Sequence, residues 1–448
     1  MTKDMTTGNP LKLILFFTVP ILIGNIFQQF YNMVDAIIVG QFLGADALGA
    51  VGAVSSLMFL IQGFANGVAQ GFGVAVSHAF GAKDMKLLRH YVALSLMLTV
   101  IISVILTVPT FLFCREMLLW INMPANIIDM AEAYLKVIFA GIIFNMAYNM
   151  TAGVLRGIGD SRTPLYFLLF SSVLNIFLDI FMIVTLKMGT AGAAYATIIA
   201  QGVSALLCLV YMFKKFTILR TTKEDYYFDF ESIKKMLSIG VPMALNYSIT
   251  ALGLTVMQSA VNVFGSNVVA AYTASSKVYC LVMRVPSSLG ATMSTYCGQN
   301  LGAERYDRIY KGIRCAFCLS FIVAAISACI SVWGGPYAVK LFINQPSEEI
   351  MQYAMQYLNT VSWFYVPLSW IFIYRNSLQG LDQGFIPMVS GGLEFAVRYV
   401  TIQFFAEKYG YAAVCYADPA TWVATAVLLM ITYYIWAFRR KKRENSMF

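Results

Sequence analysis

Residues 13–39 read LILFFTVPILIGNIFQQFYNMVDAIIV, an apolar run that contains a single charged residue, Asp35. A helix needs about 20 predominantly apolar residues to cross the hydrocarbon core of a bilayer. The run is therefore long enough to span a membrane, and it is too long for the apolar region of a cleavable signal peptide. We interpret it as the first transmembrane helix, with Asp35 as a carboxylate inside the membrane.

The composition of the whole chain agrees with this interpretation. Hydrophobic residues make up 59% of the 448 residues and charged residues 12%, whereas soluble proteins have about 45–50% and about 25%. An ordinary soluble protein is excluded, because so much apolar surface cannot be hidden from water. Twelve apolar runs are long enough to be spanning helices: 13–39, 48–76, 91–113, 132–156, 163–186, 190–213, 236–263, 270–296, 312–334, 354–380, 387–406 and 412–437.

The positive charges predict how the chain is oriented. Most of the 31 Lys and Arg residues lie in the N-terminal segment, in or beside the loops that follow the even-numbered runs, and in the tail Arg439-Arg-Lys-Lys-Arg443, with Arg375 at the end of the tenth run. Basic segments face the cytoplasm in multi-pass proteins. We therefore expect a plasma-membrane protein with both termini cytoplasmic. The net charge of +9 is then a topology signal, and no nucleic-acid partner is expected.

The two halves of the chain resemble each other. Pro20 in the first half is matched by Pro242 in the second, and Leu155-Arg-Gly-Ile is matched by Leu378-Gln-Gly-Leu at nearly the same shift along the sequence. Units with an even number of helices give parallel repeats, related by an axis along the membrane normal. The sequence thus predicts an all-α integral membrane fold of twelve transmembrane helices, in two six-helix lobes related by a pseudo-two-fold axis.

The expected domains are an N-lobe over 1–213, a cytoplasmic linker over 214–235 and a C-lobe over 236–448 that ends in the basic tail. Repeats of this kind are typical of secondary transporters, in which two bundles rock about a site near the midplane. The chain has no GxxxxGK[ST] loop for ATP. It also has no His cluster or acidic motif suited to a membrane enzyme, so we expect a transporter without a cofactor and not an enzyme.

Polar residues inside the first six runs form the candidate site of the N-lobe: Asp35, Asn145, Asn149, Asn175, Asp179 and Thr197. Asn175 and Asp179 are one helical turn apart and share a face. An oxygen-rich set with two carboxylates and no basic residue suits H⁺ or Na⁺, and Na⁺ would be held by Asp35, Asn175, Asp179 and Thr197. The alternative is that each polar group ties neighbouring helices together.

The second half does not repeat the acid pair. Met257 and Ile402 align with Asp35 and Asp179. Glu394 and Arg398 are one turn apart in the eleventh run, so we expect them to form a structural ion pair with each other. With Met257 and Arg284 they are candidates for lining the C-lobe side of a central cleft.

Several motifs together resemble the multidrug and toxic compound extrusion (MATE) family. They are Pro20-Ile-Leu-Ile-Gly-Asn in the first run, Val34-Asp-Ala-Ile-Ile-Val-Gly40 at its end, Gly81-Ala-Lys after the second run, and Leu155-Arg-Gly-Ile-Gly-Asp160 followed by Pro164. The resemblance extends from about residue 10 to about residue 440. It implies two six-helix lobes and export of cationic drugs or dyes driven by an H⁺ or Na⁺ gradient.

The resemblance also implies roles for residues. One branch of the family places its cation site in the N-lobe, where Asp35, Asn175, Asp179 and Thr197 match the pattern. Tyr134 and Asn149 resemble supporting groups of the same network. Another branch uses acids on helices 7 and 10, and the corresponding runs of this chain contain none.

The sequence therefore predicts a secondary active antiporter that exports lipophilic organic cations in exchange for H⁺ or Na⁺, through an alternating-access cleft between two lobes. Its partners would be amphipathic small-molecule cations and membrane lipid, and we expect a monomer. The alternative is a lipid-linked oligosaccharide flippase of the same superfamily.

Overall fold

A computed structural model describes residues 3–343 and 345–445 of the protein. The described part of the chain is built from helices and contains no strand, which confirms the all-α prediction. The elements of its first half are α1 (Pro10–Leu43), α2 (Ala45–Ala53), α3 (Ser55–Gly81), α4 (Met85–Leu112), α5 (Cys114–Trp120), α6 (Ile128–Ala140), α7 (Ile142–Gly157), α8 (Arg162–Ile180), the π-helical turn η1 (Phe181–Thr185), α9 (Gly189–Lys215) and the short turns η2 (Thr217–Leu219) and η3 (Lys223–Asp225).

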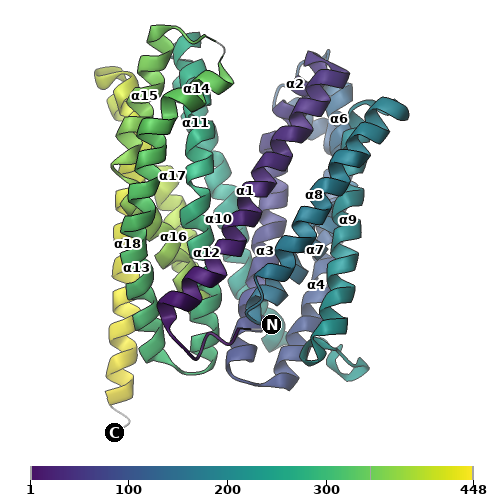
Figure 1. The fold of residues 1–448 in the computed structure, drawn as a ribbon, viewed down its shortest axis with the longest axis vertical. Helices are drawn as coiled ribbons and strands as arrows, with labels where there is room; N and C mark the ends of the chain where they lie inside the picture. Colours follow the sequence, from purple (N-terminus) through teal and green to yellow (C-terminus); the bar gives the residue numbers. More distant parts are fainter. Residues whose placement is uncertain (1–2, 344, 446–448) are drawn as a thin grey trace. The chain divides into compact units, whose positions relative to one another are not determined.

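The second half follows the same alternation of long and broken helices (Figure 1). Its elements are α10 (Phe230–Asn262), α11 (Ser266–Val282), α12 (Arg284–Gly302), α13 (Tyr306–Cys329), the π-helical turn η4 (Ile330–Gly334), α14 (Gly335–Phe342), α15 (Glu348–Ser362), α16 (Tyr365–Gly380), α17 (Phe385–Tyr409) and α18 (Tyr411–Asn445).

Each of the twelve apolar runs lies in one of these helices or in a pair of consecutive ones. Among the described residues, eight helices are long and apolar enough to cross a membrane, and nine if α6 and α7, which meet at an angle of 46°, form one span. The three other runs lie in α11–α12, α15–α16 and α17. The first two are broken in the middle, and α17 carries Glu394 and Arg398, so these spans are shorter or more polar than the rest.

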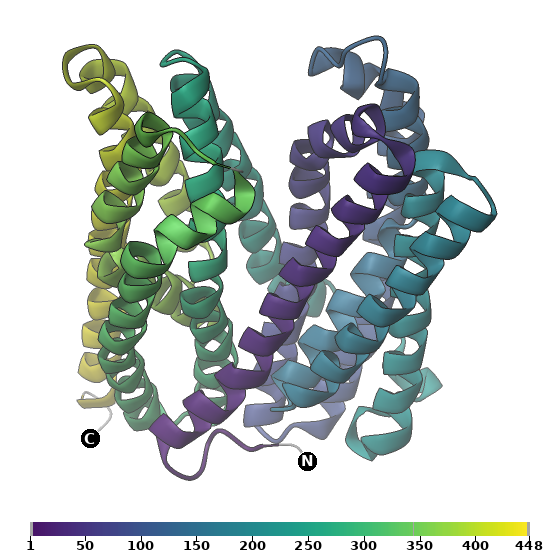
Figure 2. The same ribbon diagram turned by 45° about the horizontal axis from the view of Figure 1, so that its top comes forward.

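The helices group into two compact units. Unit 1 comprises Met1–Thr7, Val19–Ser248 and Gly298–Glu304, and unit 2 comprises Gly8–Thr18, Ile249–Cys297 and Arg305–Phe448. In unit 1, α3 packs against α4 and α7, and α9 packs against α6, α7 and α8. Figure 2 shows the same helices turned by 45°. The apolar core of unit 1 includes the fully buried side chains of Phe72, Leu88 and Phe139.

Glycines on α3 allow α10 to approach it closely within unit 1. A Cβ atom at Gly67 would lie 2.5 Å from Cα of Ala244, and one at Gly71 would lie 2.3 Å from Cα of Gly240. These positions belong to the motif Gly63-xxx-Gly67-xxx-Gly71, which permits backbones to touch. Side chains are thus excluded here, because each Cβ would meet backbone that has no room to move.

The loop between α7 and α8 fixes the start of α8. Gly159 has φ +87, and a Cβ there would lie 2.0 Å from the carbonyl oxygen of Lys3. Asp160 accepts hydrogen bonds from the backbone N–H groups of Arg162 and Thr163 at 3.0 and 3.1 Å. It therefore satisfies the free N–H groups of the first turn of α8, as capping carboxylates do. Gly159 and Asp160 of the Leu155-Arg-Gly-Ile-Gly-Asp160 motif thus have a structural explanation.

The segment before α10 is capped in the same way. Oδ2 of Asp229 accepts the backbone N–H of Ser232 at 2.9 Å. Hydrogen bonds from the side chain and backbone of Ser232 lower the pKa of Asp229. The carboxylate at the N-terminus of α10 also suits the positive end of the helix dipole.

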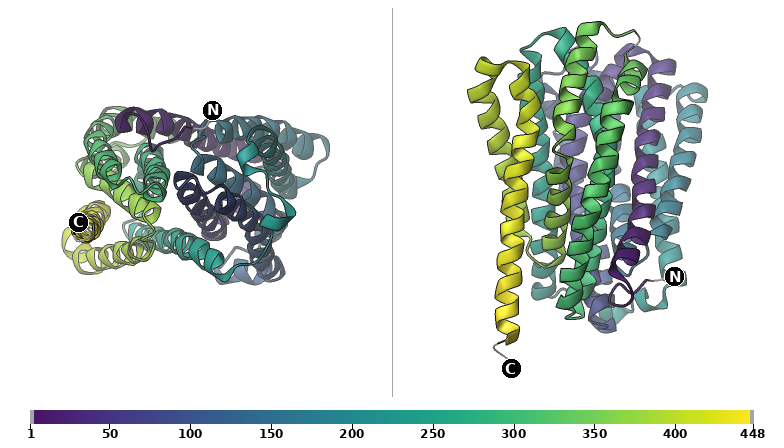
Figure 3. Two further views of the ribbon diagram at one scale, coloured as in Figure 1. Left: turned by 90° about the horizontal axis from the view of Figure 1, so that it is seen from below. Right: turned by 60° about the vertical axis from the view of Figure 1, so that its left-hand side comes forward.

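Unit 2 is held together around α18, which packs against α15, α16 and α17 (Figure 3). Aromatic rings fill its interior: Tyr272 and Tyr357 meet edge to face with centroids 5.2 Å apart, and Tyr279 stacks on Trp422 at 5.6 Å. Such pairs add to the stabilisation that burial gives. This aromatic interior surrounds the buried charges of unit 2.

Candidate cation-binding site

The two carboxylates of the predicted site come together inside unit 1. Asp35 lies on α1 and Asp179 on α8, and their carboxyl groups are within hydrogen-bonding reach of each other. Asp179 is fully buried. The cluster around it is apolar, and it includes Val34, Ile38 and Ile176. Charges interact strongly in such surroundings, because little water is present to screen them.

An amide and two hydroxyl groups border the carboxyl pair. Nδ2 of Asn175 donates to Oγ1 of Thr197 at 3.4 Å, so α8 and α9 contact each other beside Asp179. The hydroxyl of Tyr31 lies 3.4 Å from the same Oγ1. Asn175 and Thr197 are both buried. The four residues predicted to form the cation site therefore gather from α1, α8 and α9.

The oxygens at this site lack donors. Oδ1 of Asp35, Oδ1 of Asn175 and both carboxyl oxygens of Asp179 are buried and accept no hydrogen bond within the described chain. Buried polar atoms are nearly always paired, and each exception needs an explanation. A bound cation supplies one, because oxygen ligands of this kind are those that H⁺ and Na⁺ use.

The predicted supporting residues divide into two groups. Tyr134 on α6 is buried and within electrostatic range of Asp35, Asp179 and Tyr31. Asn149 instead donates to the backbone oxygen of Asn145 at 2.9 Å, and Asn145 donates to Oε1 of Gln201 at 3.5 Å. In the described chain no hydrogen bond links either Asn to the carboxyl pair. Gln201 is one turn beyond Thr197 on α9, so the Asn pair lies along the same helix interface.

Tyr31 was not among the residues predicted from the sequence. Its spacing of four residues from Asp35 places both on one face of α1. That spacing is the signal that identifies it, and its contact with Thr197 joins α1 to α9.

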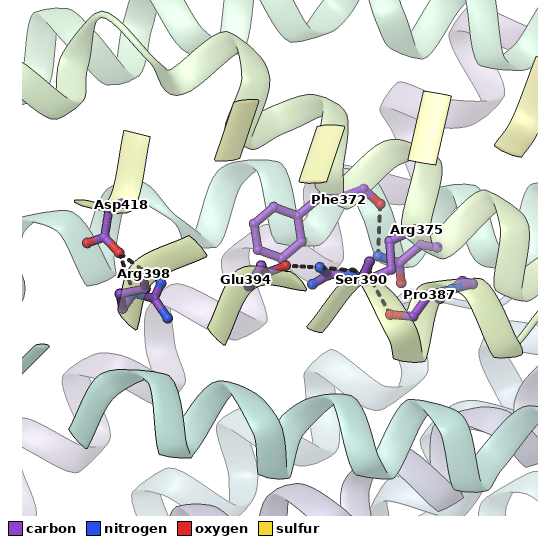
Figure 4. A network of polar contacts seen from close by, with 8 residues as sticks. Phe372, Arg375, Pro387, Ser390, Glu394, Arg398 and Asp418 are labelled. Atoms are coloured by element: carbon purple, nitrogen blue, oxygen red, sulfur yellow. Dashed lines mark hydrogen bonds and ion pairs between the residues drawn. The ribbon is translucent and has the colours of Figure 1, made fainter. Parts of the chain in front are cut away.

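The buried charges of unit 2 pair differently from the prediction. Arg398 and Glu394 do not form an ion pair: Arg398 pairs with Asp418 on α18 at 2.8 Å, and Glu394 pairs with Arg375 on α16 (Figure 4). The prediction of a Glu394–Arg398 pair was wrong. Each side chain reaches a partner on a neighbouring helix. The ion pairs therefore hold α16, α17 and α18 together, and none is formed between Glu394 and Arg398 within α17.

The other candidates in unit 2 are placed as follows. Met257 on α10 is fully buried, and Arg398 is 5% exposed. Both side chains are therefore enclosed by neighbouring residues of the described chain, and their place beside a central cleft stays a prediction. Arg284 begins α12, and its carbonyl oxygen accepts hydrogen bonds from Ser287 and Ser288 at 3.1 and 2.6 Å. Arg375, which the charge distribution assigned to the cytoplasmic side, is itself buried against Glu394 and Ser390.

Comparison with known proteins gives a consistent result along the chain. A family model described as MatE matches residues 20–181 and again residues 242–401. The two matches begin at Pro20 and Pro242, the pair that marks the internal repeat. The matched segments together cover more than half of the chain.

Curated relatives and solved structures agree with this match. The chain is 31% identical over 367 residues to the probable multidrug resistance protein YpnP of Bacillus subtilis, covering 81% of this chain and 80% of that protein. It is 29% identical over 438 residues to YoeA of the same organism, covering 95% and 94%. A crystal structure of MATE in complex with MaL6 has a TM-score of 0.91 at 23% identity, over 99% of this chain and 100% of that chain.

Proposed function

Because the chain belongs to the MatE family of multidrug transporters, we propose that it is an antiporter that exports lipophilic organic cations in exchange for H⁺ or Na⁺. It is a multi-pass membrane transporter and not an enzyme. Its relatives named as multidrug resistance proteins support an efflux role. The ion, the substrate class, the plasma membrane as its location and the cytoplasmic placement of both termini belong to the proposal.

The observation that carries the proposal is a pair of carboxyl groups, that of Asp179 fully buried and that of Asp35 partly buried, whose buried oxygens accept no hydrogen bond in the described chain. Asp35 and Asp179 meet without a basic partner in the described chain, and the Oδ1 atom of Asn175 also accepts no hydrogen bond. Two like charges within hydrogen-bonding reach of each other repel strongly in a medium of low dielectric constant. A proton or Na⁺ removes this repulsion, and the site therefore favours loading with a cation.

The same three helices give the site a means to respond to the ion. Binding neutralises charge between α1 and α8, and the contacts of Thr197 with Asn175 and Tyr31 join α9 to both. Asp179 is also followed closely by the π-helical turn η1, and π-helical turns are frequent at functional sites. Ion loading thus favours one packing of α1, α8 and α9 and ion release favours another. The ion shifts the equilibrium between them by its differential affinity.

A negatively charged site that alternates between loaded and empty states suits a positively charged substrate. The drug and the ion then need not bind at one place, because coupling requires only that each disfavours the state that binds the other. We expect amphipathic monocations as substrates and a monomeric transporter in the lipid bilayer, with no cofactor.

The proposal is tested by transport in proteoliposomes. A cationic dye and an anionic dye of matched size are offered with an imposed pH gradient and, separately, with an imposed Na⁺ gradient. We expect gradient-driven transport of the cation only, and its loss in Asp35→Asn and in Asp179→Asn. Equal transport of the anion, or transport by both variants at the wild-type rate, contradicts the proposal. Movement of a lipid-linked oligosaccharide in place of either dye would favour the flippase alternative.

A further inference from the structure

The proposed function leaves one buried polar network in unit 2 unused. Nε and Nη2 of Arg398 donate to Oδ1 of Asp418 at 3.1 and 2.8 Å, and the hydroxyl of Tyr357 donates to Oδ2 at 3.0 Å. Arg398 and Asp418 are each 5% exposed, and Tyr357 is 1% exposed. Figure 4 shows Arg398 on α17 pointing toward Asp418 on α18. A complete ion pair is thus enclosed within the unit.

The internal repeat makes this network the counterpart of the cation site of unit 1. Gly189-Thr-Ala-Gly-Ala-Ala-Tyr-Ala-Thr197 aligns with Gly410-Tyr-Ala-Ala-Val-Cys-Tyr-Ala-Asp418, and both segments start with a glycine of positive φ, +62 and +59. Thr197 therefore corresponds to Asp418. These segments also open α9 and α18, so the correspondence holds for helices as well as for letters.

The other members of the network correspond in the same way. Tyr134-Leu is matched by Tyr357-Leu, at the same shift that relates the Leu155 motif to the Leu378 motif on the helices that follow. Asn175 is matched by Arg398 at the shift that relates Pro164 to Pro387, and the first residues of α8 and α17 are related by this shift too. Tyr357, Arg398 and Asp418 thus stand where unit 1 has Tyr134, Asn175 and Thr197.

One contact is common to both units. In unit 1 the amide of Asn175 donates to Thr197, and in unit 2 the guanidinium of Arg398 donates to Asp418. Tyr31 of unit 1 corresponds to Gly253, where an added Cβ would lie 2.2 Å from Nη1 of Arg398. The missing side chain at Gly253 is what makes room for the guanidinium.

The charges, in contrast, are redistributed. Unit 1 holds two carboxylates and no basic residue in its site, whereas unit 2 has Met257 and Ile402 at the positions of Asp35 and Asp179. The carboxylate of the Tyr357–Arg398–Asp418 network, Asp418, already has a cation at 2.8 Å. Further titratable groups within electrostatic range of this pair are Glu394, Tyr272, Tyr279, Cys280 and Cys415. Glu394 is neutralised by Arg375.

We propose that the guanidinium of Arg398 is a tethered cation that permanently occupies the counterpart of the ion site in unit 2. This inference rests on the proposed function of the unit 1 site. A side chain held by the backbone loses no translational freedom on binding, so a free ion at ordinary concentration does not displace it. Unit 2 then takes up no exchangeable ion, and coupling runs through unit 1 alone. Removing the guanidinium uncovers a cation site made by Asp418 and Tyr357.

The test begins from the purified Asp35→Asn/Asp179→Asn protein, which has lost both carboxylates of the unit 1 site and is called the silent protein below. Arg398→Asn is added to this protein, because Asn is the residue of unit 1 at this position. Binding is followed by calorimetric titration with Na⁺ at fixed pH and by acid titration at fixed Na⁺. We expect no ion binding by the double variant over the range titrated, and binding of one Na⁺ or one H⁺ by the triple variant, with an affinity at least tenfold above the weakest that the titration detects.

Two matched variants separate charge from packing. Arg398→Lys keeps a tethered cation, and Arg398→Asn with Asp418→Thr reproduces the neutral pair of unit 1. In the silent protein neither is expected to gain an ion. A gain in either variant, or no gain in a folded Arg398→Asn protein, overturns the proposal. Should Arg398→Asn fold only in high Na⁺ or in acid, that rescue supports it. Failure to fold under every condition, while Arg398→Asn/Asp418→Thr folds, contradicts it.

The result of this test does not depend on ion binding by the wild type. A wild-type protein that binds no ion contradicts the proposed function. The cation site uncovered by Arg398→Asn is measured separately, in protein that lacks the unit 1 carboxylates. Ion binding by the silent protein before Arg398 is changed would contradict the tethered cation directly.

Discussion

Replacing Asp179 with Asn removes one charge from the carboxyl pair and keeps the volume of the side chain. Two carboxylates about 4 Å apart repel by about 4 kcal/mol at an effective dielectric constant of about 20. Asp179 is fully buried and accepts no hydrogen bond in the described chain, so nothing else in its contacts offsets this repulsion. We expect the ion-free Asp179→Asn protein to be more stable than the ion-free wild type.

The same repulsion sets the affinity for the ion. Since about 1.4 kcal/mol is a factor of ten in an equilibrium constant, losing about 4 kcal/mol weakens cation binding by about 10³-fold. A ligand at 100 times its Kd stabilises the folded state by about 2.7 kcal/mol. Addition of the coupling ion should therefore stabilise the wild type by about this amount, and the effect should vanish in Asp179→Asn over the same concentration range.

The assay is the thermal unfolding midpoint of purified protein, measured across Na⁺ at fixed pH and across pH at fixed Na⁺. Asp46→Asn is the matched control, because Asp46 on α2 is an exposed carboxylate of the same unit. It should keep the wild-type ion dependence. A wild type that is indifferent to both ions, or an Asp179→Asn protein with undiminished ion dependence, would refute the reasoning.

Three further outcomes are expected. Gly71→Ala should destabilise unit 1 by about 1–3 kcal/mol through overpacking against Gly240, whereas Gly52→Ala, with nothing within 4 Å of its Cβ, should not; equal thermal midpoints would contradict the close α3–α10 contact. Arg398→Met alone should lower the free energy of unfolding by about 3–5 kcal/mol, because it leaves the carboxylate of Asp418 buried without a counter-charge. Arg398→Met with Asp418→Leu should recover most of this loss. Additive effects of the two substitutions in chemical unfolding would show that the two side chains do not interact as an ion pair. Glu394→Gln should lower stability by leaving Arg375 without its carboxylate while ion-driven dye export continues; loss of ion coupling with unchanged stability would count against a structural role.

The spanning helices were predictable because their signal is local. Each apolar run is long enough on its own to require a helix in lipid, and the structure places a helix or a broken pair at every one. The breaks at Gly141 and near Trp363 were not predicted. They lie inside continuous apolar sequence, and neither residue is a proline.

The candidate site was predictable to the extent that buried charge is costly. Asp35 and Asp179 are conspicuous in apolar runs, and the spacing of Asn175 and Asp179 fixes their common face. The contact of Tyr31 with Thr197 depends on how α1 meets α9, which hydropathy does not encode.

The pairing of Arg398 shows where such reasoning fails. A spacing of four residues allows an ion pair with Glu394, but side chains on neighbouring helices compete for both charges. Asp418 lies near the start of an apolar run, one residue before Pro419, and only the packing of α17 on α18 brings it to Arg398. The sequence pattern identified Glu394 and Arg398 but not Asp418, and tertiary contacts decided the partners.

The central claim is that the cation bound by Asp35 and Asp179 is exchanged for drug, and equilibrium binding tests it most directly. The affinity of purified protein for a fluorescent lipophilic cation is measured while Na⁺ is titrated at fixed pH and H⁺ at fixed Na⁺. Coupling between sites is typically about 5- to 150-fold in affinity and must be reciprocal. The account predicts that one of the two ions weakens drug binding within this range, that drug weakens binding of that ion equally, and that Asp35→Asn abolishes both effects. Drug affinity that is flat in both titrations, with Asp35→Asn indistinguishable from wild type, would contradict it.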